Sequence, residues 1–206
     1  MVRFSACVLL LASALSAQQS VPRSGPQARS KSAAIESGAI RDGIYYNSSF
    51  GFSYKLPFGW VDRTRQMQDD SADTSKSLLL LAVFERPPEA RGETINSAVV
   101  IAAERASIYS GMKTAADYFG PLTELTTAKG FQVINPPYDF PLGTSHLVRG
   151  DFSKLRGTLT MWQSSLVMLQ KGYAVSFTFI GASEDEVNQL IEKMKFGTSK
   201  PRVAVR

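Results

Sequence analysis

The stretch "YYNSSFGFSYKLPFGW" (residues 45–60) contains seven aromatic residues, two Gly and one Pro. Such a segment could be a binding surface, a membrane anchor or the start of a hydrophobic core. From residue 50 to residue 56, apolar side chains alternate with Gly, Ser and Lys, which is the period of a half-buried strand. Pro57 and Gly59 then favour a turn before Trp60. We therefore predict a core strand here, with turn-forming residues on both sides of it.

Further strands are predicted along the chain. Residues 77–85 (SLLLLAVFE) and 97–105 (SAVVIAAER) are continuous apolar runs, as expected of strands covered on both faces. Residues 144–153, 158–170 and 173–182 are separated only by short polar segments that suit hairpin turns. The last three segments should therefore be successive antiparallel strands.

The segment 183–197 (SEDEVNQLIEKMKFG) has the pattern of an amphipathic helix. Ser183 and Glu186 match a capping box, and an acidic first turn suits the positive end of a helix. The predicted apolar stripe consists of Val187, Leu190, Ile191 and Met194. Gly197 is expected to end the helix.

A second helix is expected to begin near Thr114. Its predicted buried face consists of Tyr118, Leu122 and Leu125, and Gly130 should end it. Pro121 lacks a backbone N–H, so we expect it to kink or divide this helix after Phe119.

Residues 1–17 (MVRFSACVLLLASALSA) have the layout of a secretory signal peptide: one Arg, a short apolar run and small residues at the end. The run is shorter than a bilayer span requires, so we predict cleavage and a mature protein without a membrane span. The single cysteine, Cys7, lies within this segment, so no disulfides are expected. The predicted location is exported, either periplasmic or secreted.

The rest of the chain divides into three parts by composition. Residues 18–41 are rich in Ser, Ala, Gln, Gly and Pro, which predicts a flexible tether, and residues 198–206 resemble it and should be a disordered tail. One domain should therefore span residues 42–197. The formal net charge of +5 fits an anionic envelope component or an acidic partner, whereas no basic helix or motif indicates nucleic acid.

The search for catalytic chemistry finds little. The only histidine, His146, would need a nucleophile and a carboxylate to serve as a hydrolase base, and no nucleophile elbow is present. No cofactor-binding motif or spaced set of metal ligands is found. A hydrolase that uses His146 stays the weakest hypothesis. Trp60 and Trp162 are the other candidates for ligand or partner contact, although core packing would explain both.

The run from Tyr46-Asn47 through Phe50-Gly51-Phe52 to Gly59-Trp60 resembles the opening of PsbP-like and DcrB-like domains. The closing segment 171–196, a strand followed by an amphipathic helix and a Phe, resembles the end of the same domains. The resemblance covers residues 43–197 and implies an α+β fold, with an antiparallel sheet flanked by helices in an α/β/α sandwich. This chain lacks the lipid-anchor cysteine of lipoprotein members, and its single His leaves no counterpart for metal ligands proposed in photosynthetic relatives.

Members of this fold have varied roles, so the fold does not imply one function. We predict a non-enzymatic exported envelope protein that binds an envelope protein or an anionic envelope component as an accessory module. The alternative is a lipid or small-ligand module with a pocket between helix and sheet, which a cavity beside Pro121 would favour.

Overall fold

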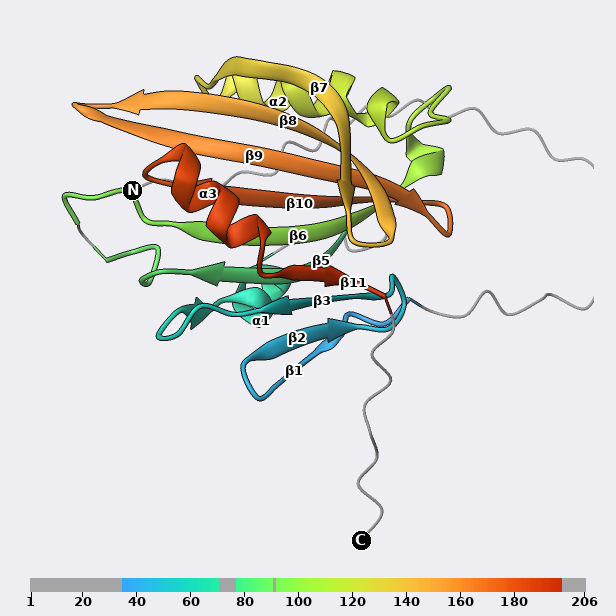
Figure 1. Ribbon diagram of the computed structural model, residues 1–206, viewed down its shortest axis with the longest axis horizontal. Helices are drawn as coiled ribbons and strands as arrows, with labels where there is room; N and C mark the ends of the chain where they lie inside the picture. Colours follow the sequence, from blue (N-terminus) through green and yellow to red (C-terminus); the bar gives the residue numbers. More distant parts are fainter. Residues whose placement is uncertain (1–34, 71–76, 91, 198–206) are drawn as a thin grey trace, which may run out of the picture. The chain divides into compact units, whose positions relative to one another are not determined.

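The computed structural model describes residues 35–70, 77–90 and 92–197 of the 206-residue chain. These residues form two antiparallel sheets with three α-helices (Figure 1). This arrangement confirms the predicted fold class, an α+β fold with antiparallel sheet flanked by helices. The predicted signal peptide, residues 18–34 of the predicted tether and the tail lie outside the described residues.

The larger sheet has seven strands. In spatial order they are β4 (Val61–Asp62), β5 (Ser77–Phe84), β6 (Ala98–Arg105), β10 (Tyr173–Gly181), β9 (Leu159–Gln170), β8 (Ser145–Arg156) and β7 (Gln132–Leu142). The five strands predicted in this part of the chain are confirmed as β5, β6, β8, β9 and β10. Strand β7 was not predicted because Pro136, Pro137 and Pro141 interrupt it. Such residues are tolerated at the edge of a sheet, where β7 lies.

The smaller sheet has the strand order β1 (Ala39–Arg41), β2 (Ile44–Asn47), β3 (Phe52–Lys55) and β11 (Met194–Phe196). Strand β1 includes residues 39–41, which the sequence analysis placed in the tether, so strand pairing begins before residue 42. The pairing joins the two ends of the domain, because β11 pairs with β3 across most of the chain length.

The aromatic stretch is confirmed as core. Phe50, Phe52 and Tyr54 are at most 3% exposed. The ring of Phe52 packs edge-on against Phe177 of β10 with 5.0 Å between centroids, and Tyr54 lies 6.2 Å from Phe179 of the same strand. The inward face of the small sheet therefore packs on one face of the large sheet.

The predicted turn before this strand is held by Asn47. Its Oδ1 accepts a hydrogen bond from the backbone N–H of Phe50 at 2.9 Å, and its Nδ2 donates to the Tyr45 hydroxyl at 3.0 Å. Asn47 is 1% exposed, so these bonds satisfy an amide that is buried in the core.

Helix α3 (Glu184–Ile191) covers the same face of the large sheet beside the small sheet (Figure 1). The predicted cap is confirmed: Ser183 Oγ accepts from the N–H of Glu186 at 3.1 Å. The Glu186 carboxylate accepts a hydrogen bond from the backbone N–H of Ala182 at 2.8 Å. In the usual capping box, the donor would be the N–H of Ser183, one residue later.

The predicted end of this helix was wrong. The helix ends at Ile191, and Met194–Phe196 forms β11 instead of a last turn. The spacing of Met194 suits a helical stripe, but Met194 also alternates with the exposed Lys195. Met194 therefore fits both the period of a helix and the period of a strand, and its pairing with Tyr54 of β3 favours the strand.

The opposite face of the large sheet is covered in part by a 3₁₀ turn, η2 (Ala116–Tyr118), followed by α2 (Phe119–Ala128). The segment is divided as predicted, but between Tyr118 and Phe119 and not after Phe119. Pro121 lies in the first turn of α2, where its missing N–H has no intrahelical partner to lose. Tyr118 and Phe119 pack on Val167 and Ala174.

The prediction that Leu125 belongs to the buried face of α2 was wrong. Leu125 is 57% exposed, whereas Phe119 and Thr126, seven residues apart, are buried. Because α2 begins at Phe119, its buried side follows Phe119 and Thr126, and Leu125 lies outside it. Phe119 packs tightly on β8, because a Cβ at Gly150 would lie 2.7 Å from its ring.

Two further features differ from the sequence predictions. Strand β6 is less buried on one face than on the other, because Val100 and Ala102 are partly exposed on the side that faces away from the small sheet. Helix α1 (Thr64–Asp69) was not predicted, because it has no buried residue and so no apolar stripe. None of the helices among the described residues is long and apolar enough to cross a bilayer.

We expect Phe52→Ala to lower the free energy of unfolding by about 3–5 kcal/mol, because it opens a cavity where the two sheets meet. Tyr46→Ala, on the exposed side of the adjacent strand, should change it by less than about 0.5 kcal/mol. Urea unfolding followed by circular dichroism measures both. Equal losses would contradict the assignment of inward and outward faces.

Candidate functional site

A buried ion pair lies between β8 and α3. Arg149 Nε donates to Asp151 Oδ1 at 2.7 Å, and each residue is 6% exposed. The guanidinium also donates to Ser164 Oγ of β9 at 3.0 Å and to Asn188 Oδ1 of α3 at 2.9 Å. Arg149 therefore connects two strands to the helix that covers them.

The second oxygen of Asp151 is also occupied. Oδ2 accepts from Asn135 Nδ2 and from the Tyr138 hydroxyl, both at 3.1 Å and both from β7. Burial on its own would raise the pKa of Asp151, but hydrogen bonds from Ser164, Arg149 and Asn135 together outweigh it and hold the pKa below its usual range. The carboxylate is ionised with both oxygens in use, so this group holds the structure together and is not poised to accept a proton.

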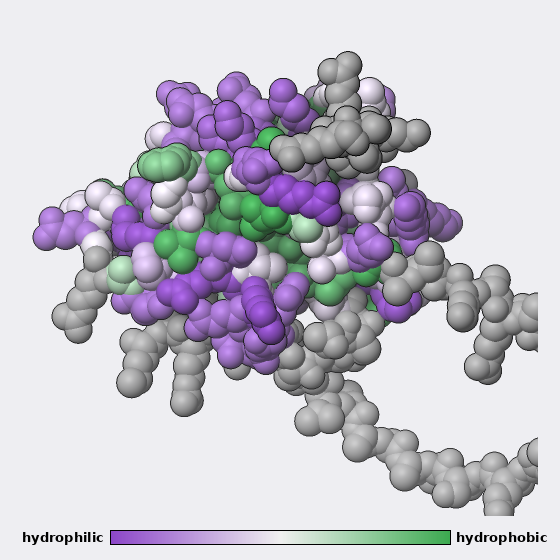
Figure 2. All heavy atoms as spheres, turned by 90° about the horizontal axis from the view of Figure 1, so that it is seen from below, coloured by the Kyte–Doolittle hydropathy of each residue, from purple (hydrophilic) through white to green (hydrophobic). Residues whose placement is uncertain are grey.

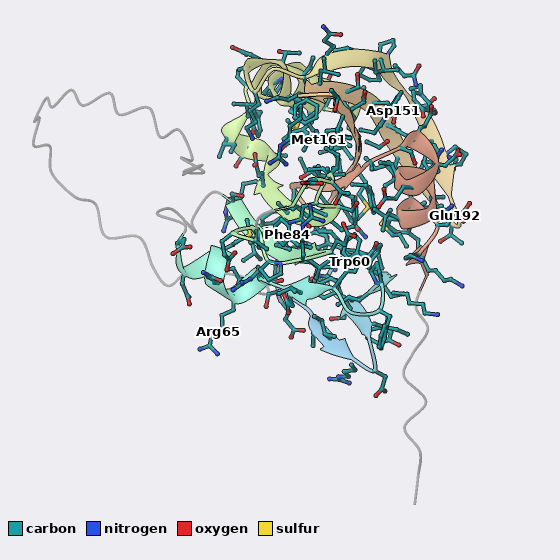
Figure 3. The ribbon with its side chains drawn as sticks, turned by 90° about the vertical axis from the view of Figure 1, so that its left-hand side faces the viewer. Trp60, Arg65, Phe84, Asp151, Met161 and Glu192 are labelled. Atoms are coloured by element: carbon teal, nitrogen blue, oxygen red, sulfur yellow. The ribbon has the colours of Figure 1, made fainter. Side chains whose placement is uncertain are left out.

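Beside the ion pair is a small cavity of about 10 Å³, lined by residues that include Asp151, Trp162, Ser164 and Glu184. This volume suits about one water molecule. Figure 3 shows Asp151 close to α3. The space between helix and sheet at this point is too small for a lipid or a drug-sized ligand, which needs about 300 Å³ or more.

A different kind of surface is formed at the end of the large sheet where β5 meets β6 and β8 meets β9. The antiparallel register brings three connections together there: residues 56–60, 85–97 and 154–161. We call this surface the loop end; it lies at the left of Figure 1 and faces the viewer in Figure 3.

Phe58 is the most exposed large apolar side chain of the loop end, at 104%. It occupies the tip of a tight turn in which the N–H of Trp60 donates to the carbonyl of Pro57. Gly59 has a φ of 80°, which a type II turn requires at this position and which a residue with a Cβ seldom adopts. The turn therefore holds the ring of Phe58 out in solvent.

Other apolar side chains surround this turn or lie across the loop end from it. Leu155 is 71% exposed at the tip of the β8–β9 hairpin, and Trp60, Phe84 and Met161 are partly exposed (Figure 3). In the view from below, the hydrophobic area lies in the middle of the surface and not at its left, where the loop end is (Figure 2). Aromatic residues and Met are enriched at protein interfaces.

An open hollow of about 250 Å³ lies in the loop end, lined by Arg86, Asn96, Arg156 and their neighbours. Arg86 donates to the Thr94 hydroxyl at 2.9 Å and to the Thr94 carbonyl at 2.6 Å, which fastens the 85–97 loop. Arg156 is exposed and has no ion pair with any described residue. The hollow therefore contains two guanidinium groups beside the apolar residues. That of Arg86 is hydrogen-bonded to Thr94, and that of Arg156 could bind a partner.

The structure separates the three residues that the sequence singled out. Trp60 lies in the loop end, Trp162 lines the small cavity under α3, and His146 is exposed on β8 opposite Pro141 of β7. No described side chain forms a hydrogen bond or ion pair with His146. Neither of the two cavities above is lined by Pro121.

The residues that the sequence analysis missed are Phe58, Leu155, Arg86 and Arg156. The turn signal around Pro57 and Gly59 predicted where the chain reverses, and a large apolar residue at the tip of such a turn was the available clue. Nothing in the sequence indicated that the 85–97 loop and the β8–β9 hairpin share one end of a sheet.

We expect Asp151→Ala to lower the free energy of unfolding at pH 7 by about 3–5 kcal/mol, because it leaves the Arg149 charge buried and unpaired. The folded-state pKa of Asp151 is below its unfolded value of about 3.9, so its contribution to stability is present above about pH 4. That contribution is lost as the pH falls through the folded-state pKa. In urea unfolding, the difference in free energy of unfolding between the unaltered protein and Asp151→Ala should therefore become smaller below pH 4.

Asp139→Ala is the matched control, because Asp139 is an exposed carboxylate on the adjacent strand. It should leave stability at pH 7 within about 0.5 kcal/mol of the unaltered protein. The double variant Arg149→Met, Asp151→Leu should lose less than Asp151→Ala alone, since no charge is left unpaired. Equal effects of Asp151→Ala and Asp139→Ala would disprove the role of the ion pair.

No protein-family model matches the chain, and no curated protein sequence matches it. Among solved structures, the chain is similar to a cyanobacterial PsbP (CyanoP) from Synechocystis, with 16% identity, a TM-score of 0.46, and coverage of 74% of this chain and 91% of that one. It is also similar to LpqN of Mycobacterium tuberculosis, a protein involved in cell envelope biogenesis, with 13% identity, a TM-score of 0.36, and coverage of 71% and 83%.

A third structure, from Bacteroides thetaiotaomicron, has 12% identity and a TM-score of 0.37. The likeness covers 73% of this chain, which spans just under half (46%) of that protein. A PsbP structure is among the solved structures found. At these identities and TM-scores, no function of these proteins is transferred to this chain.

Proposed function

We propose that this protein is an exported, non-enzymatic accessory module of the cell envelope that binds a protein partner through the loop end. The observation that carries the proposal is Phe58, an aromatic side chain that a Pro–Gly turn holds fully in solvent at one end of a sheet. Exposing a Phe ring costs free energy in the isolated protein, and a partner that buries it recovers that free energy.

The composition of the loop end supports a protein partner. Trp, Phe, Met and Arg are the residues that interfaces favour, and Trp and Arg are frequent among those that dominate binding energy. In this surface, Phe58 and Leu155 would supply apolar anchors, and Arg156 would pair with a carboxylate or carbonyl of the partner.

Export is part of the proposal because of the predicted signal peptide. A binding role is preferred to catalysis because the described residues bring no nucleophile or carboxylate to His146, and because Asp151 is fully used by its neighbours. The pocket alternative is less favoured, since the cavity between α3 and the sheet suits about one water molecule.

We expect a photo-crosslinking residue, benzoylphenylalanine in place of Phe58, to give one saturable protein adduct in envelope extract of the source cells. Excess untagged protein should compete for the adduct, and Arg156→Ala should weaken it roughly tenfold, in the range of a typical interface contact. Mass spectrometry of the adduct identifies the partner.

The matched control places the same residue at Leu125, which is exposed on α2 and outside the loop end. It should not give the adduct. The same adduct from both positions, or none from Phe58, would contradict the proposal. Recovery of a bound lipid or small molecule without a protein adduct would favour the ligand-binding alternative.

A further inference from the structure

A second surface, on the small sheet, has a different composition from the loop end. Side chains alternate along strands, so burying Phe52, Tyr54 and Met194 turns Ser53, Lys55 and Lys195 to the opposite side. The register adds Tyr46, which is opposite Ser53, and Arg41, which shares a row with Ile44 and Lys55. We call the outward residues Arg41, Tyr46, Ser53, Lys55 and Lys195 the basic face.

The three cations of the basic face are unpaired in the part of the chain that the structure describes, although the exposed Asp42 follows Arg41 in the turn between β1 and β2. None of them has an ion pair or a side-chain hydrogen bond with another described residue, and all three are exposed. Lys55 and Lys195 are diagonal neighbours on paired strands, a separation of roughly 7–8 Å between Cβ atoms. The two ammonium groups therefore belong to one patch of positive charge, which attracts anions that come within about one Debye length, roughly 8 Å at physiological salt.

We propose that the basic face binds the surface of an anionic phospholipid bilayer. Lys is depleted from protein–protein interfaces but attracts anionic lipid headgroups as a simple charge, without a fixed geometry. Tyr46 is 38% exposed, and a Tyr beside the cations suits the headgroup region, where its ring is apolar and its hydroxyl stays wet. Cations spread over one sheet face fit an extended anionic surface better than a single acidic peptide.

This inference concerns a surface separate from the loop end and does not depend on the protein partner proposed there. Sedimentation of the full chain with vesicles of phosphatidylglycerol and phosphatidylcholine tests it. Binding should rise with the phosphatidylglycerol fraction and fall with added salt. The triple variant Arg41→Gln, Lys55→Gln, Lys195→Gln should bind on the order of 100-fold more weakly.

The matched control is Arg65→Gln, Lys113→Gln, Lys129→Gln, which removes three exposed cations from other parts of the surface. It should retain most of the binding. The apolar N-terminal segment is common to all variants, so its contribution cancels in the comparison, and vesicles of phosphatidylcholine alone measure it. The variant Arg41→Lys, Lys55→Arg, Lys195→Arg should restore binding, because charge and not shape is required.

Two results would overturn the proposal. Equal losses in the triple variant and its control would show a response to net charge without a specific face. Binding to phosphatidylglycerol vesicles no stronger than to phosphatidylcholine vesicles would exclude a membrane, and retention on polyglutamate in that case would indicate an acidic protein. Matching circular dichroism melting curves of all variants ensure that lost binding is not lost folding.

Discussion

The packing of the small sheet on the large one is the contact on which most of the structure depends. Phe52, Phe177 and Phe196 form a cluster of three rings, with centroids 5.0–6.1 Å apart. Phe52 comes from β3 near the start of the domain, and the other two come from β10 and β11 near its end. Burying Phe52 fixes which side chains of β3 point inward. Because β11 pairs with β3, Lys195 lies opposite Ser53 and faces outward. The basic face is therefore a direct result of the aromatic core: the same alternation that buries the rings exposes the cations.

The ion pair of Arg149 and Asp151 has a complementary role on the other half of the same sheet face. There the sheet is covered by α3, which presents Asn188 to the guanidinium, and by the edge strand β7, which presents Asn135 and Tyr138 to the carboxylate. Its value lies in specificity as much as in stability, because a helix and a strand edge both have to be correctly placed to satisfy it. It also accounts for the only strongly buried charges among the described residues.

The two proposed surfaces differ in composition, and this difference suits them to different partners. The loop end presents Phe, Trp, Met and Arg at one end of the large sheet, which suits a protein that buries apolar anchors. The basic face presents Lys, Arg and Tyr on a sheet, which suits a diffuse anionic surface. A protein that contacts a bilayer by one face and a partner by another would act as an adaptor, which agrees with the accessory role proposed above.

Much of this protein could be predicted from its sequence. The alternation around Phe52 and Tyr54 predicted a core strand, and the three segments between residues 144 and 182 predicted a run of antiparallel strands, because these signals are local and periodic. The cap at Ser183 was likewise readable, since it depends on residues within one helical turn. What the sequence could not decide were choices between patterns that fit equally well, such as the helix or strand at Met194 and the buried side of α2.

The candidate surfaces depended on tertiary structure throughout. Trp60 was identified from the sequence, but Phe58, Leu155 and Arg156 belong to a common surface only because strand register brings their connections to one end of the sheet. The basic face depends in the same way on the pairing of β11 with β3, which are separated by almost the whole domain. Local sequence determined the strands, their turns and the surplus of positive charge; long-range pairing and burial decided which side chains became neighbours and which faced solvent.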